Sequence, residues 1–123
     1  MSYITVDLDW PEKLAVRASW HRLERLGYNP EGRVSASGHG VHIRSKGRPE
    51  IPIEVNERER RYANDDKERI YGDKTDRLPN NQVLWDTKNG DKAGEWTDSL
   101  ETLIARYDRS CKLTPNQYKQ KYE

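Results

Sequence analysis

The chain has little sulfur and few purely apolar side chains. Cys111 is its single cysteine, so neither an intramolecular disulfide nor a cysteine-based zinc cluster can form within it. Phenylalanine is absent and only 33% of the residues are hydrophobic, whereas four tryptophans and seven tyrosines supply aromatic rings that also form hydrogen bonds. The sequence therefore predicts a small core that relies on each of its apolar residues.

An excess of charge of one sign is also missing. The 22 basic and 21 acidic side chains leave a formal net charge of +1, so any contact with nucleic acid must come from a local basic patch. No apolar run reaches membrane length, and we expect a soluble, cytoplasmic protein with no membrane partner. We assign residues 1–110 to one domain and residues 111–123 to a polar extension with a short helix.

The clearest local pattern is a strand with one apolar and one acidic face. Residues 3–9 alternate between apolar and polar side chains, which is typical of a half-buried strand. Asp7 and Asp9 fall on the polar face. The apolar face consists of Ile4, Val6 and Leu8.

A glycine-rich turn joins two further strands. Residues 33–37 and 40–45 predict a hairpin, because the connection between them is too short for another structure. If Val41 and Ile43 face the core, then His42 emerges on the opposite face. The hydrophobic pattern therefore predicts that this histidine shares the open face of the sheet with the two aspartates of the first strand.

The remaining patterns complete the expected order of elements. They predict a helix between Pro11 and Gly27, an edge strand over 51–55, a helix beginning at Asp65, a strand over 82–86 and a helix over 98–107. This order is typical of an α+β fold, with helices packed on one face of a mixed or antiparallel sheet.

Two carboxylates at alternate positions of one strand are suited to a divalent cation. They lie about 7 Å apart along the strand, and Mg²⁺ or Mn²⁺ accepts a few carboxylates together with phosphate oxygens of a substrate. A histidine on the same face can hold a phosphate oxygen, and glycines let the backbone come close to it. Each feature alone is also typical of a solvated strand face, so only their combination points to a site.

The combination resembles a known superfamily. Asp7-Leu8-Asp9 is similar to the first motif of the archaeo-eukaryotic primase superfamily, and the segment from Ser37 to His42 is similar to its second motif. The resemblance implies an RRM-like sheet of the primase-polymerase catalytic-core type, with a site for two Mg²⁺ or Mn²⁺ ions. It also implies metal-dependent, template-directed nucleotidyl transfer in replication of a virus, plasmid or archaeal replicon.

The resemblance assigns roles to individual residues. Asp7, Asp9 and Asp86 would be catalytic and bind metal, with Asp65 and Asp66 as weaker substitutes for Asp86. The proposed nucleotide-binding residues are Ser37, Gly38, Gly40, His42 and Arg44. Charge, not the resemblance, indicates Arg44 and the proposed nucleic-acid contacts Lys46 and Arg48, because these three follow His42 with no acidic residue before Glu50 and can neutralise phosphate. The expected partners are nucleoside triphosphates, single-stranded or primed DNA, and a replication subunit or helicase.

Two other functions stay open. The domain can be a catalytically degenerate primase-like module that binds nucleic acid or a protein subunit. It can also be a rolling-circle Rep-type nuclease, for which Tyr118 and Lys121 have the expected spacing, although His39 and His42 would point to opposite faces of one strand. The basic residues at 58, 60 and 61 alternate with glutamates, which favours a salt-bridged, solvated face.

Overall fold

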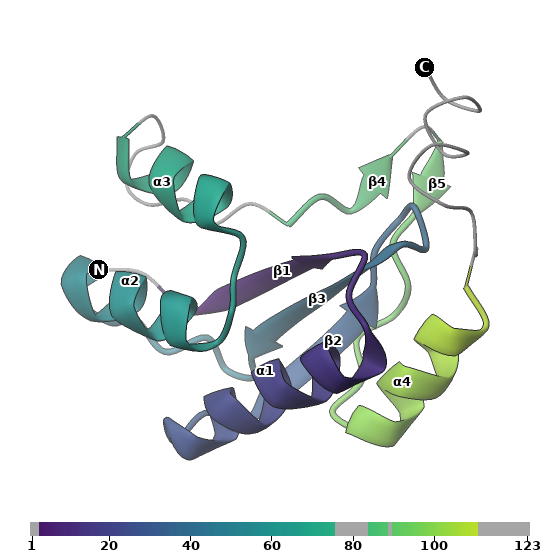
Figure 1. Cartoon of the computed structure of the whole chain (residues 1–123), viewed down its shortest axis with the longest axis horizontal. Coiled ribbons are helices and arrows are strands. Elements are labelled where there is room, and N and C mark those ends of the chain that lie inside the picture. The colour runs from purple at the N-terminus through teal and green to yellow at the C-terminus, as the bar shows by residue number, and fades with distance from the viewer. Residues whose placement is uncertain (1–2, 76–83, 89, 111–123) are drawn as a thin grey trace.

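A computed structural model describes residues 3–75, 84–88 and 90–110 and gives an α+β fold (Figure 1). Three strands form an antiparallel sheet in the order β1-β3-β2. These strands are β1 (Thr5–Asp9), β2 (Pro30–Val34) and β3 (Gly40–Ser45). A separate short ladder pairs β4 (Thr87–Lys88) with β5 (Asp91–Lys92). The helices are α1 (Lys13–Arg25), α2 (Ile53–Tyr62), α3 (Lys67–Thr75) and α4 (Leu100–Asp108).

The register of the sheet confirms the alternation expected from the sequence. Val6 lies opposite Ile43 in the ladder between β1 and β3, and Asp7 lies opposite His42. Val6 and Ile43 are both fully buried. Because neighbouring side chains on a strand point to opposite faces, the aspartate and the histidine share the face away from the core.

Helices α1 and α4 cover the apolar face of the sheet. The buried apolar residues that they contribute are Val16, Trp20, Leu23, Leu103 and Ile104. Gly32 of β2 permits the close packing, because a Cβ atom there would lie 2.6 Å from a methyl carbon of Leu103 and 3.2 Å from the Trp20 ring. The lower part of Figure 1 shows both helices beneath the sheet.

Helices α2 and α3 lie beside β1, which forms one edge of the sheet. The Asn56 amide donates a hydrogen bond to the Tyr3 carbonyl oxygen (2.9 Å), and the Ser19 hydroxyl of α1 donates to the Ala63 carbonyl oxygen (2.7 Å). The expected strand over 51–55 is wrong, since α2 begins at Ile53. The buried face of α2 carries Asn56 and Arg60, so its helical period is hidden in the hydropathy pattern.

The hairpin expected over 33–45 forms, but its first strand covers Pro30–Val34 in place of 33–37. The helix after Pro11 is confirmed, and it ends before Gly27, which has a positive φ of 93°. The helix near 98–107 is also confirmed, with the Ser99 side chain accepting a hydrogen bond from the Thr102 amide (3.2 Å). The strand expected over 82–86 does not form at residues 84–86. Residues 82–83 and the extension 111–123 lie outside the described residues.

An RRM-like sheet needs a further strand beside β1, and the described residues do not supply one. Across the same described ranges, no helix combines the length and the apolar character that a membrane span requires.

Candidate nucleotide and metal site

Three aspartates line one pocket at the edge of the sheet. Asp7 and Asp9 project from β1, and Asp66 reaches the same pocket from the segment that precedes α3. The pocket has a volume of about 400 Å³, and its other lining residues are Leu8, Pro11, Ala15 and Asn64. The structure thus gathers acidic oxygens from two distant parts of the chain around one open volume.

Burial and the neighbouring carboxylates make ionisation of Asp7 and Asp9 unfavourable. Burial, followed by the negative charge of Asp9, raises the pKa of Asp7 from 3.8 to about 7, although the Arg69 guanidinium acts in the opposite direction. Burial and then the charge of Asp66 also raise the pKa of Asp9, while Lys88 opposes this shift. A divalent cation bound between Asp7 and Asp9 would relieve the repulsion between their charges more effectively than Arg69 or Lys88 does.

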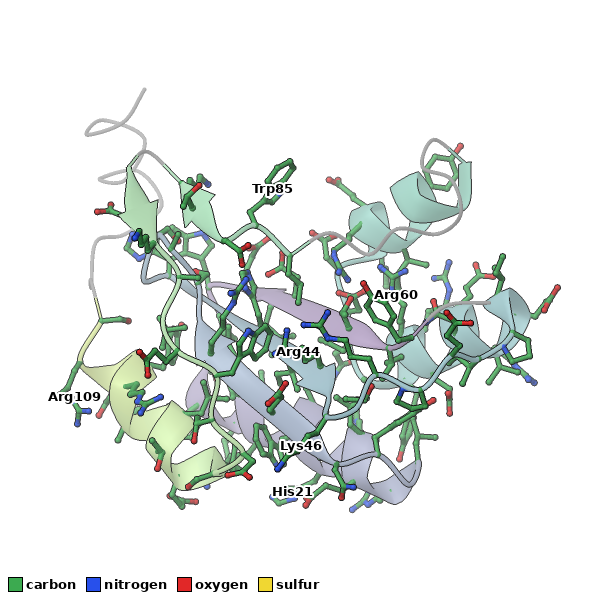
Figure 2. The ribbon with its side chains drawn as sticks, turned by 180° about the vertical axis from the view of Figure 1, so that it is seen from behind. His21, Arg44, Lys46, Arg60, Trp85 and Arg109 are labelled. Carbon is green, nitrogen blue, oxygen red and sulfur yellow. The ribbon has the colours of Figure 1, made fainter. Side chains whose placement is uncertain are left out.

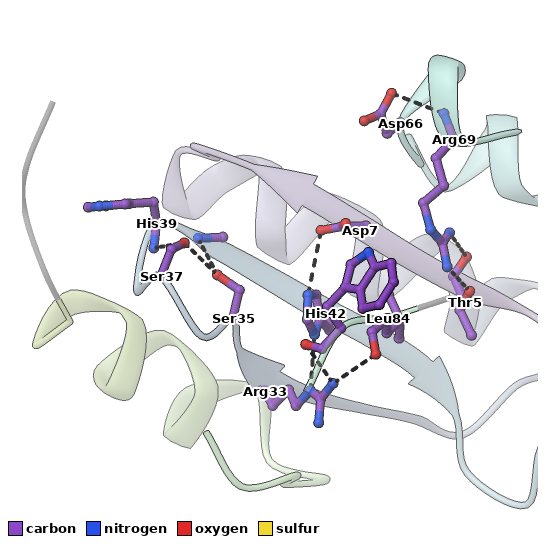
Figure 3. A network of polar contacts seen from close by, with 12 residues as sticks. Thr5, Asp7, Arg33, Ser35, Ser37, His39, His42, Asp66, Arg69 and Leu84 are labelled. Carbon is purple, nitrogen blue, oxygen red and sulfur yellow. Dashed lines mark hydrogen bonds and ion pairs between the residues drawn. The ribbon is translucent and has the colours of Figure 1, made fainter. Parts of the chain in front are cut away.

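His42 is held in one orientation by Arg33 of β2, its cross-strand neighbour. The Arg33 Nε donates a hydrogen bond to His42 Nδ1 at 3.0 Å. A guanidinium can only donate, so Nδ1 must accept, and the neutral imidazole carries its proton on Nε2. That nitrogen lies 3.8 Å from Asp7 Oδ1 (Figure 3), so the donor of His42 faces the acidic side of the site.

The environment of His42 disfavours a second proton. Burial, and then the positive charges of Arg33 and Arg69, lower the pKa of His42 from 6.5 to about 3, although Asp86 raises it slightly. The imidazole is therefore neutral at pH 7. It acts there as a hydrogen-bond donor through Nε2 and does not contribute a positive charge.

Asp86 occupies a different position from the other aspartates. Its carboxylate accepts a hydrogen bond from Arg33 Nη1 at 2.8 Å, and its side chain is 84% exposed. The residue that shares a pocket with Asp7 and Asp9 is Asp66, which the sequence indicated only as a substitute. Asp86 as third carboxylate thus stays a prediction, and Asp66 is the better placed candidate.

Asp65 fixes the backbone of the acidic strand. Its side chain is fully buried, and Oδ2 accepts hydrogen bonds from Arg60 Nε and Arg69 Nη1, both at 2.7 Å. Its Oδ1 accepts from the backbone amides of Asp7 (2.8 Å) and Asp66 (2.9 Å). One carboxylate therefore sets the relative positions of two of the aspartates that line the pocket. The interpretation of residues 58, 60 and 61 as a solvated face is consequently wrong for Arg60, which is fully buried.

The glycine-rich turn uses its own polar groups. The Ser35 hydroxyl accepts from the Gly40 amide at 3.0 Å, and the Ser37 hydroxyl accepts from the His39 amide at 3.2 Å. The Gly38 amide donates to the Ser35 carbonyl oxygen at 3.0 Å. These amides are hence satisfied within the turn, and a phosphate would have to replace those contacts in order to bind them.

Two of the basic residues after His42, Arg44 and Lys46, have acidic partners that are distant in sequence. Arg44 Nε donates to Glu31 Oε1 at 2.5 Å, and the Arg44 guanidinium stacks on the Trp96 ring at 3.7 Å. Lys46 Nζ lies 3.2 Å from Asp98 Oδ2. The expectation that this segment has no acidic residue beside it is therefore wrong for Arg44 and Lys46. Arg48 lies over the Tyr3 ring at 5.6 Å.

The donor set at the pocket fits a hard divalent cation in part. Carboxylate oxygens are the ligands that Mg²⁺ and Mn²⁺ prefer, and Asp7 and Asp9 supply them from adjacent positions on one face. Among the described residues, no three histidine, cysteine or acidic side chains form a ready-made metal-binding group. These two aspartates would therefore hold an ion together with water or substrate phosphate oxygens.

One residue at the site, Arg33, was not predicted from the sequence. Arg33 connects His42 to Asp86, and its guanidinium stacks on Trp96 at 4.6 Å. Arg33 could have been predicted from the hairpin, because it lies directly opposite His42 and the two side chains share one face. Asp65 was predicted only as a substitute for Asp86 and as a helix start. Its role as the buried partner of two arginines could not be predicted, because Arg60 and Arg69 lie on helices whose packing the sequence does not reveal.

His39 lies in the turn before β3 and stacks on Trp10, with ring centroids 4.0 Å apart. It is buried, and its carbonyl oxygen accepts a hydrogen bond from the Trp10 amide at 2.8 Å. These contacts fix the turn against the end of β1.

Comparisons of the chain with protein-family models, with curated proteins and with solved structures give no match.

Proposed function

We propose that this domain binds a nucleoside triphosphate with Mg²⁺ or Mn²⁺ and carries out nucleotidyl transfer on a DNA template. The proposed setting is replication of a virus, plasmid or archaeal replicon, in the cytoplasm. The primed or single-stranded template and a replication subunit or helicase are the proposed macromolecular partners. The proposed fold relationship is to the RRM-like core of primase-polymerases.

One observation carries this proposal. Asp7 lies directly opposite His42 in the β1–β3 ladder, and both project from the open face together with Asp9. Acidic oxygens for a cation and a neutral donor for a phosphate thereby lie side by side. If Asp7 and His42 lay on opposite faces of the sheet, the cation and the phosphate could not bind next to each other.

The residues divide the chemistry between them. Asp7 and Asp9 would hold the cation, which when bound neutralises phosphate charge and activates the attacking 3′-hydroxyl. His42 would donate from Nε2 to a phosphate oxygen, in the orientation that Arg33 imposes. Asp66 extends the acidic lining of the same pocket, and Asp65 keeps both acidic segments in place.

Incorporation of nucleotides into a primed template tests the activity. With Mn²⁺ present, we expect the wild type to extend the primer and the Asp7→Ala/Asp9→Ala variant to give only background. His42→Ala should lower the rate about tenfold to a hundredfold, because a hydrogen bond to a charged group is lost. Glu50→Gln, which changes an exposed carboxylate elsewhere, is the matched control. Extension by the double aspartate variant at the wild-type rate would contradict the proposal.

A catalytically degenerate nucleic-acid-binding or subunit-interaction module is the second candidate. The absence of a ready-made three-residue metal group among the described side chains favours it, as do the amides of the 35–40 turn, which are satisfied internally. A well-folded wild type that binds DNA without extending any primer would identify this function. The Rep-type nuclease is less supported, since His39 lies outside β3, and its other residues, Tyr118 and Lys121, lie outside the described residues.

A further inference from the structure

Trp85 is a large aromatic side chain that stands in solvent next to the proposed site. Its side chain is exposed (72% for the residue) and points away from the sheet in Figure 2. Within the described ranges no other ring or guanidinium stacks on it, whereas the Trp96 ring carries the guanidinium groups of both Arg33 and Arg44. Single exposed apolar residues are common on protein surfaces, so exposure alone does not indicate a function for Trp85. Its position beside the proposed site is the relevant observation.

The backbone of Trp85 is attached to the site by Arg33. The Arg33 Nη2 donates to the carbonyl oxygens of Leu84 and Trp85, both at 3.4 Å, while Nη1 binds the Asp86 carboxylate. The Arg33 side chain is itself only 7% exposed, and its Nε contacts His42. One buried guanidinium therefore connects the proposed phosphate donor to the segment that presents the indole (Figure 3).

Resting on the proposed function, we propose that Trp85 is a stacking platform for a nucleobase. The base of a nucleotide is joined to its phosphates through the sugar, so a ligand whose phosphates lie at His42 holds its base over the neighbouring surface. Trp85 presents an exposed indole there, and its backbone carbonyl oxygen accepts a hydrogen bond from the same arginine that contacts His42. Every base has a flat π-face, and stacking on an aromatic side chain strengthens binding by about fivefold to a hundredfold per base. The base can belong to an incoming nucleotide or to an unpaired strand, since both present the same chemistry.

Calorimetric titrations with two related ligands test this role. In the presence of Mn²⁺, ATP carries a base whereas inorganic tripolyphosphate does not. We expect Trp85→Ala to weaken ATP about tenfold or more and to leave tripolyphosphate unchanged. Trp85→Phe, which keeps a ring, should retain most of the ATP affinity. The control variant Leu14→Ala removes another apolar side chain, 76% exposed on α1, and should change neither ligand.

Titration of an oligothymidylate, followed by fluorescence anisotropy, separates the two sources of the base. Weakening of the oligonucleotide alone identifies an unpaired strand, and weakening of ATP alone identifies the incoming nucleotide. Unchanged affinity of Trp85→Ala for both ligands would overturn the stacking role, as would an equal loss for tripolyphosphate. If the wild type binds tripolyphosphate with Mn²⁺ in that case, the proposed function stands without this inference. If the wild type binds none of the three ligands, both fail.

Discussion

Replacing Asp65 with alanine is expected to lower the free energy of unfolding by about 3–5 kcal/mol, a large part of the roughly 5–15 kcal/mol that stabilises a typical domain. The carboxylate is fully buried between Arg60 and Arg69, and it also accepts the amides of Asp7 and Asp66. Alanine would leave two buried guanidinium groups without their carboxylate. Urea unfolding followed by circular dichroism measures the loss.

Asp66→Ala is the matched control for this prediction. The Asp66 side chain accepts from the Glu68 amide at 2.9 Å and thus caps the beginning of α3. Loss of such a cap costs about 1 kcal/mol. A similar cost for both variants would mean that the Asp65 network does not hold α2, α3 and β1 together. Asp65→Asn, which keeps an acceptor oxygen, should fall between the two.

Replacing Asp7 with asparagine is expected to stabilise the fold at pH 8 by about 2 kcal/mol. The pKa shift corresponds to about 4 kcal/mol, and burial of the asparagine amide offsets part of that gain. Since the pKa of Asp7 is about 7 in the folded protein and 3.8 in the unfolded chain, the folded state binds a proton more tightly. The stability that this proton contributes is fully present below pH 3.8 and is lost as the pH rises through 7. Asparagine cannot ionise and avoids that loss. The expected rise in Tm at pH 8 is roughly 5–10 °C.

The same variant should also change the response to acid. His42 has a pKa of about 3 when folded and 6.5 when unfolded, so its contribution is present above pH 6.5 and falls between pH 6.5 and 3. In the wild type this loss is offset by the gain from Asp7 over nearly the same range. Asp7→Asn should therefore lose stability on acidification from pH 6.5, and adding His42→Gln should remove that slope. Equal stability of wild type and Asp7→Asn at pH 8 would contradict the assigned burial and repulsion.

A carboxylate that destabilises its own fold is a common property of functional sites. Asp7 is held near Asp9 and Asp66, and the described residues provide no ion pair that neutralises the three together. If the Asp7→Asn variant is more stable than the wild type but no longer binds a divalent cation, then the Asp7 carboxylate both lowers the stability of the fold and binds the cation.

The sequence predicted the parts of the site that depend on strand alternation. The period of two along 3–9 and 40–45 placed Asp7, Asp9 and His42 on one face, and the register confirms that placement. This inference needed only the burial of a few apolar residues. It succeeded because a shift of one residue would have exposed the whole apolar face of β1.

The parts that were not predicted depend on buried polar residues. Helix α2 buries Asn56 and Arg60 where an ordinary helix buries apolar side chains, so the alternation of 51–55 suggested a strand instead. Asp65 seemed to be a helix cap because its arginine partners become neighbours only after packing. Similarly, Arg44 and Lys46 meet Glu31 and Asp98, acids that lie 13 and 52 residues away in the chain.

Titration of the wild-type protein with ATP, with and without Mn²⁺, tests the central claim most directly. Calorimetry should show saturable binding that requires Mn²⁺ and that disappears in Asp7→Ala/Asp9→Ala, while Glu50→Gln binds like the wild type. Each variant is first checked for cooperative unfolding, so that loss of binding is not loss of fold. Equal binding without Mn²⁺, or full binding by the double aspartate variant, would contradict the assignment of this face as a metal and nucleotide site.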